Sequence, residues 1–155
     1  MDRGPFWRSS FKTTQRMLEM NLDGFPEDRA GQAIAPGIAA PAWLVGHLVR
    51  SRRGILRLLG APLPEDPAWD PYQRHADGQG AHLPLADLLG AFQATDAPLK
   101  AALQAVPDWT QPTLNPALQQ EQPLEQVVGF LHTHEAYHVG QLGLMRRLAG
   151  LKGAI

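Results

Sequence analysis

Apolar residues recur at intervals of three and four along four stretches of the chain, the spacing that gathers side chains on one face of a helix. The predicted helices span residues 5–23, 41–59, 84–106 and 123–149. No segment alternates apolar and polar residues in the way that would predict a β-strand. Because four amphipathic helices can bury their apolar faces against one another, the pattern predicts an all-α protein, a four-helix bundle.

A long connection, residues 61–83, joins the second and third predicted helices. The second helix should measure roughly 28 Å at 1.5 Å per residue, a distance that the connection can easily run back. The second and third helices can therefore be parallel, joined by a long crossover. Gly60 and Gly150 follow the second and fourth helices, where a terminating glycine is expected. Pro98 lies inside the third helix and is expected to kink or split it.

Composition narrows the class of protein. The 155 residues are expected to form one domain, 1–155, and 44% hydrophobic with 19% charged residues is typical of a soluble globular chain. A net charge of −1 gives no field that would attract nucleic acid or an anionic membrane. No apolar run approaches the ~18 residues of a membrane span, and no secretory segment is visible at the start. We therefore expect a cytoplasmic protein of bacterial type, without nucleic-acid or membrane partners.

Two histidines, His134 and His138, lie four residues apart in the last predicted helix, so their rings are about 40° apart around its axis. His47 lies on the apolar stripe of the second helix, and all three rings are expected to face the bundle interior. Each ring on its own can be a hydrogen-bonded core histidine. Two adjacent inward imidazoles, however, do not easily satisfy each other without a proton or a cation between them. Three inward histidines therefore favour a metal site, and since the chain has no cysteine, its ligands must be histidines and carboxylates.

The same segment reads H-E-x-x-H, the motif of zinc proteases. A protease needs a third ligand downstream, but no Asp, Glu or His other than His138 follows Glu135. Gln141 and Leu144 also stand where the metzincin continuation requires Gly and His. The sequence therefore argues against proteolysis, and Glu135 is expected either to be solvated or to hydrogen-bond a neighbouring helix.

Three further histidines are weaker candidates. His132 lies about 200° around the helix from His134 and is expected at the surface or at an interface. His75 and His82 lie in the crossover connection and are spare ligands at most.

The second helix also carries a basic cluster: Arg50, Arg52, Arg53 and Arg57. These arginines are expected to form a solvated face, with Arg50 as a candidate partner for a carboxylate on a cosubstrate. Gln141, one turn after His138, either orients a ligand ring or packs between helices.

Three strings, WLVGHL at 43–48, HEAYHVGQL at 134–142 and LMRRLAG at 144–150, together resemble the DinB-like (DinB/YfiT) superfamily of metalloenzymes. The resemblance covers nearly the whole chain. It implies a four-helix bundle with up-down-down-up order and a divalent metal ion, often zinc or nickel. It also implies that His47, His134 and His138 are the ligands.

Characterised relatives include S-transferases and isomerases that use low-molecular-weight thiols. Three neutral histidines leave a coordination position open, where water or a thiol can become a nucleophile. The leading hypothesis is thus a metalloenzyme acting on a small molecule, either a thiol-dependent S-transferase or a metal-assisted hydrolase. The alternative is a non-catalytic metal- or ligand-binding bundle in stress response. A homodimer is left open. The crossover near Trp69 to His82 is predicted to border the metal site and to control access to it, as loops on rigid scaffolds often do. The alternative is that it only returns the chain along the outside of the bundle.

Overall fold

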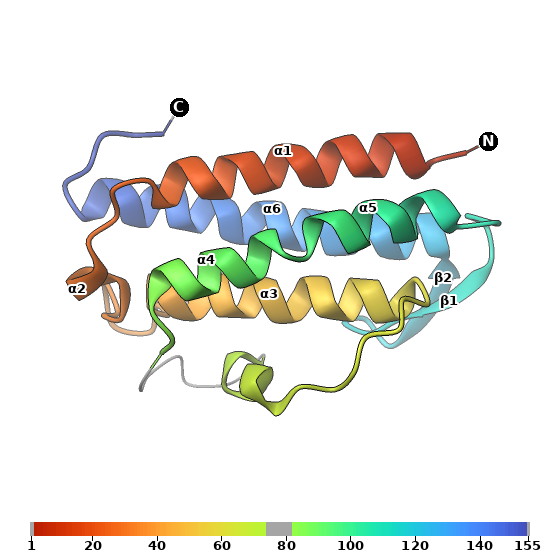
Figure 1. The fold of residues 1–155 in the computed structure, drawn as a ribbon, viewed down its shortest axis with the longest axis horizontal. Coiled ribbons are helices and arrows are strands. Elements are labelled where there is room, and N and C mark those ends of the chain that lie inside the picture. The colour runs from red at the N-terminus through yellow and green to blue at the C-terminus, as the bar shows by residue number, and fades with distance from the viewer. Residues whose placement is uncertain (1, 74–81, 155) are drawn as a thin grey trace.

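The computed structural model describes residues 2–73 and 82–154, and it consists mainly of helices. The long helices are α1 (Gly4–Leu22), α3 (Pro41–Leu58), the consecutive pair α4 (Leu85–Gln93) and α5 (Asp96–Ala105), and α6 (Leu124–Leu148). Figure 1 shows that α1 and α6 run in one direction, whereas α3 and the α4–α5 pair run in the other. This is the up-down-down-up bundle that the sequence predicts. Each long helix packs along two neighbours: α1 against α6 and α5, and α3 against α6 and α4.

The first part of the long connection, residues 61–73, runs back alongside α3, as Figure 1 shows. It contains one short 3-10 helix, η1 (Pro67–Tyr72), and a four-residue helix α2 (Glu27–Ala30) lies between α1 and α3. Gly60 and Gly150 end α3 and α6 with φ angles of 79° and 84°, which glycine adopts without strain. None of the described helices has both the length and the apolar character that crossing a bilayer requires.

Pro98 splits the third predicted helix. Because proline has no amide hydrogen, it cannot donate to the carbonyl of residue 94, four positions before it. The helix breaks there, between Gln93 and Asp96. Thr95 stabilises the break, since its hydroxyl donates a 2.6 Å hydrogen bond to the Phe92 carbonyl.

The expectation that the chain contains no strand was wrong. A small antiparallel hairpin, β1 (Pro112–Asn115) and β2 (Gln120–Pro123), connects α5 to α6. Its strands are four residues long and mostly exposed, so they carry little alternation of apolar and polar residues. The buried Asn115 holds the turn instead: its Oδ1 accepts from Ala117 N at 3.0 Å, and its Nδ2 donates to Gln122 Oε1 at 3.0 Å.

Apolar side chains from all four long helices fill the interior in two clusters. The first lies toward α2 and η1 and includes Leu18, Leu48, Leu88, Phe92 and Leu142. The second lies toward the hairpin and includes Phe11, Ile55, Leu99, Leu103 and Val128. Each fully buried leucine or phenylalanine contributes about 1.5–3 kcal/mol to the stability of the fold, so the bundle has a substantial core without staples.

Candidate metal centre

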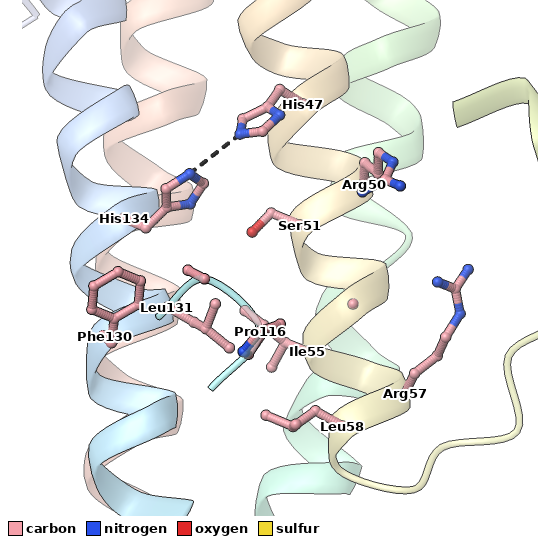
Figure 2. Close-up of a pocket in the computed structure, with 12 residues that line it drawn as sticks. His47, Arg50, Ser51, Ile55, Arg57, Leu58, Pro116, Phe130, Leu131 and His134 are labelled. Atoms are coloured by element: carbon pink, nitrogen blue, oxygen red, sulfur yellow. Dashed lines mark hydrogen bonds between the residues drawn. The ribbon is translucent and has the colours of Figure 1, made fainter. Parts of the chain in front are cut away.

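Two neighbouring helices bring the three predicted histidines together. His47 projects from α3, and His134 and His138 project one turn apart from α6, which packs antiparallel to α3. The Nε2 atom of His134 lies 3.2 Å from Nε2 of His47 and 3.1 Å from Nε2 of His138. Figure 2 shows His47 and His134 pointing toward each other across the space between the helices. With one nitrogen from each ring, the three donors lie within 4.8 Å of one another and could hold a metal ion.

The outer nitrogens of two rings are hydrogen-bonded in a way that determines their tautomers. His47 Nδ1 donates to the Tyr72 carbonyl at 2.8 Å, and His138 Nδ1 donates to Gln141 Oε1 at 2.6 Å. Both acceptors are oxygens without a hydrogen, so Nε2 of each neutral ring carries a lone pair. His134 Nε2 lies within 3.2 Å of the Nε2 atoms of both other rings, so the three rings direct nitrogen atoms toward one point. The donor set therefore suits a divalent cation, and the outer bonds are of the kind that orient metal-ligating histidines.

The charge state of His138 also favours a cation. Burial lowers the pKa of His138 below its usual value, and the hydrogen bond to Gln141 opposes this only in part. A histidine with a lowered pKa stays neutral at pH 7, and the neutral ring is the form that binds a metal.

Trp43, Gly46 and His47 lie on the face of α3 that meets η1. The Trp43 ring stacks on the His47 ring with centroids 4.9 Å apart and an interplanar angle of 9°. Trp43 Nε1 donates to the Pro71 carbonyl at 3.0 Å. A Cβ atom at Gly46 would overlap the ring of Tyr72. The absence of a side chain at residue 46 thus lets Tyr72 approach closely enough for its carbonyl to accept from His47.

These contacts confirm that the crossover connection borders the histidine cluster through residues 71 and 72. Control of access by the connection stays a prediction. Tyr72, which is almost fully buried, lies in direct contact with His47 through its backbone. No sequence motif identified this residue, because its contribution is a carbonyl group that every residue possesses.

The profile of the DinB superfamily matches residues 10–142, most of the chain. The protein belongs to the DinB superfamily. Among solved structures, it is similar to YfiT from Bacillus subtilis, described as "a probable metal-dependent hydrolase with an unusual four-helix bundle topology". The two share 16% sequence identity and a TM-score of 0.71 over 98% of this chain and 90% of YfiT, a likeness that shows the fold. No curated protein matches the chain.

The expectation that the arginines of α3 form a solvated face was wrong for Arg52. Arg52 is 0% exposed and forms a bidentate pair with Glu135, which is 1% exposed: Nε to Oε2 at 2.8 Å and Nη2 to Oε1 at 2.9 Å. Thr14 also donates to Glu135. Of the two alternatives for Glu135, the structure therefore shows the hydrogen bond to neighbouring helices. Both carboxylate oxygens accept hydrogen bonds, and the expectation that Glu135 is not a protease base stays a prediction.

The histidines do not face the bundle interior as the sequence suggested, because Glu135 and not His134 or His138 lies on the buried face of α6. The buried face of α6 runs through Val128, Glu135, Val139 and Leu142, so His134 and His138 lie on its flank and are half-buried. His47 is half-buried as well. The cluster thus faces the edge of the α3–α6 interface, where a small molecule can reach it, and not the centre of the bundle.

Two further histidines, His132 and His82, lie apart from the cluster. His132 packs between α6 and α1, with its ring edge-on to Phe11 at a centroid distance of 5.0 Å, which confirms that it points elsewhere. His82 lies beside Tyr72 with ring centroids 6.0 Å apart, and it is not a member of the cluster. His75 lies outside the described residues.

A cavity of about 410 Å³ opens next to the histidines. It lies between α3 and α6, with His47 and His134 at one end and the hairpin turn at Pro116 and Ala117 as a third wall. Its size is that of a pocket for a small molecule.

Proposed function

We propose that this DinB-superfamily member is a metal-dependent enzyme that acts on a small molecule. His47, His134 and His138 bind one divalent ion, zinc or nickel, and the reaction joins a thiol or a water molecule to an electrophilic substrate. The observation that carries the proposal is the convergence of three Nε2 atoms, two of them with lone pairs fixed by outer hydrogen bonds. The similarity to YfiT, described as a probable metal-dependent hydrolase, supports the hydrolytic form of the reaction.

When bound, a divalent ion with three neutral histidine ligands supplies a Lewis acid that lowers the pKa of a water or thiol. The protein supplies the rest. Tyr72 and Gln141 hold two rings in the metal-binding tautomer, and Trp43 fixes the plane of His47 by stacking. The adjacent cavity receives the electrophile. Since the chain has no cysteine, a thiol nucleophile must arrive with a low-molecular-weight cosubstrate.

The second candidate is a bundle that binds a metal or ligand without catalysis, acting in stress response. One observation favours it: among the cavity-lining residues that the structure describes, none is an aspartate or glutamate that could serve as a general base. The buried carboxylate of Glu135 is already held by Arg52 and Thr14.

Metal binding is tested first. Purified protein is loaded with Zn²⁺ or Ni²⁺, desalted and analysed for metal by mass spectrometry. The proposal expects about one ion per chain, and a large loss of metal in His47→Ala, His134→Ala and His138→Ala, with unchanged helical circular dichroism. The matched control is His132→Ala, which also removes one imidazole from α6 and is expected to retain the ion. Full metal content in His138→Ala would contradict the ligand assignment.

Catalysis is tested with the metal-loaded protein. A panel of electrophiles is offered with small thiols, and a panel of esters and amides is offered with water. Turnover that disappears in His134→Ala supports the enzyme. Tight metal binding without turnover on either panel would select the second candidate.

A further inference from the structure

Apolar side chains form most of the lining of the cavity beside the histidines. Ile55 and Leu58 come from α3, Phe130 and Leu131 from α6, and Pro116 from the hairpin turn. Figure 2 shows Ile55 and Leu58 along the side of α3 that faces α6. The hydrogen bonds of Asn115 hold the turn in place, so the third wall is preformed. A wall of this kind accepts the apolar body of a ligand.

The charged groups of the cavity are of one sign. Arg50 and Arg57 line it, and no acidic residue is found among the lining residues that the structure describes. Arg57 pairs with the exposed Glu65 at 3.3 Å, and an exposed pair of this kind contributes little and exchanges easily. Arg50 makes no hydrogen bond or ion pair within residues 2–73 and 82–154. The cavity therefore offers one uncommitted guanidinium to an anion.

A second polar group lies closer to the histidines. Ser51 is one helical turn after His47, and its hydroxyl points from α3 toward α6 between His47 and Ile55 in Figure 2. This hydroxyl, too, has no hydrogen-bond partner within the described part of the chain. The cavity thus has nitrogen donors and a hydroxyl at one end and apolar walls beyond them, and Arg50 lies on α3 at the level of the polar end (Figure 2).

We propose that the cavity binds a small amphipathic carboxylic acid in its ionised form. The apolar part of the molecule lies against Ile55, Leu58 and Leu131, and its carboxylate pairs with Arg50. A guanidinium matches a carboxylate with two parallel hydrogen bonds, and a single uncommitted arginine matches a single negative charge. The proposal rests on the proposed function only in making this molecule the substrate, because the binding itself needs no metal.

The test uses octanoate as an amphipathic carboxylate and octanamide as its neutral analogue. Binding to the full chain is followed by calorimetry and by amide chemical shifts, with and without bound Zn²⁺. Octanoate is expected to shift amides of α3, α6 and residues 116–118, and to bind about tenfold more tightly than octanamide, the effect of one charge-assisted hydrogen bond. Equal affinity for the two probes would overturn the carboxylate assignment, as would tighter binding of octyl phosphate than of octanoate.

Variants locate the site. Arg50→Gln is expected to weaken octanoate about tenfold and to leave octanamide unchanged. Arg16→Gln, which removes an exposed arginine of α1 outside the cavity lining, is the matched control and is expected to leave both probes unchanged. Ala117→Leu enlarges an exposed residue of the turn and is expected to weaken both probes by occupying the cavity. Equal losses in the two glutamine variants would show a general charge effect and overturn the assignment.

The experiments distinguish a failure of the metal-dependent function from a failure of the carboxylate-binding cavity. Octanoate binding that depends on Arg50 in a chain that takes up no metal would leave the cavity assignment standing and remove the metal-dependent function. Metal binding through the three histidines without octanoate binding would overturn the cavity assignment alone.

Discussion

The guanidinium of Arg52 connects three helices of the bundle at a single point. From α3 it reaches Glu135 on α6, and its other nitrogens donate to the Phe11 carbonyl and to Gln15 Oε1 on α1, at 3.1 Å and 2.8 Å. Its Cζ atom lies over the Phe92 ring, 3.9 Å from the ring centre. Phe11 and Phe92 belong to different apolar clusters, so the ion pair lies where the two clusters meet.

A buried pair of this kind is weak evidence of net stability, because both charges have lost their water. Removing one partner is a different matter, since the other charge then remains buried without compensation. Arg52→Met is therefore expected to lower the free energy of unfolding by ~3–5 kcal/mol. Urea unfolding followed by circular dichroism measures the change.

The double variant Arg52→Met/Glu135→Leu separates the two effects. Because it removes both charges and keeps apolar volume, it is expected to be more stable than Arg52→Met alone. Arg57→Met, at an exposed arginine of the same helix, is the control and is expected to change stability by less than about 1 kcal/mol. A double variant no more stable than Arg52→Met would contradict this account.

The crossover connection acts on the histidine cluster through one face of α3. Trp43, Gly46 and His47 of this helix all lie against η1. The close approach of the Tyr72 ring explains why residue 46 in the WLVGHL string is a glycine. Gly46→Ala places a methyl group where the Tyr72 ring lies, so the Tyr72 carbonyl must move away from His47. We expect metal affinity to fall about 10- to 100-fold, the usual cost of losing a bond that orients a ligand. Competition with a fluorescent chelator measures the affinity.

Two variants separate this effect from a general disturbance of α3. Gly54→Ala makes the same change in the same helix where a Cβ meets no atom within 4 Å, and it is expected to keep metal affinity. Tyr72→Phe keeps both the ring and the carbonyl, and it is expected to keep the affinity too. Equal losses in Gly46→Ala and Gly54→Ala would mean that η1 does not orient His47.

Helical phase predicted most of the elements and slightly misplaced the site. It identified the four long helices, the split at Pro98 and the pairing of His47 with His134 and His138. The same phase also places Arg52 between Leu48 and Ile55 on a buried face, but the charge of its side chain led to the expectation of solvent. A buried arginine requires a buried partner from another helix, and this partner is visible only once the helices are packed.

Two parts of the site left no trace in the sequence pattern. The Tyr72 contact is made by a backbone carbonyl, and the hairpin wall of the cavity is held by the side chain of Asn115 and not by alternating residues. Sequence therefore predicted the ligand candidates better than the surroundings that orient them and form the cavity.

At the scale of the whole molecule, the proposed ion would connect α3 to α6. A ligand that binds only the folded state stabilises it by mass action, by about 2.7 kcal/mol at one hundred times its dissociation constant. Zn²⁺ or Ni²⁺ at that excess is expected to raise the free energy of unfolding by about this amount, measured by urea unfolding with and without the ion. His134→Ala is expected to lose the gain, and His132→Ala to keep it. An equal gain in both variants would locate binding elsewhere.

Because α1 packs alongside α6, α1 cannot complete its packing until α6 has been synthesised. About 100 residues separate the end of α1 from the start of α6, and ribosomes add roughly 5–20 residues per second. For several seconds, therefore, the nascent chain holds an apolar helix whose principal neighbour does not yet exist. During this interval the face of α1 that packs on α6 is uncovered, and His47 lacks both His134 and His138.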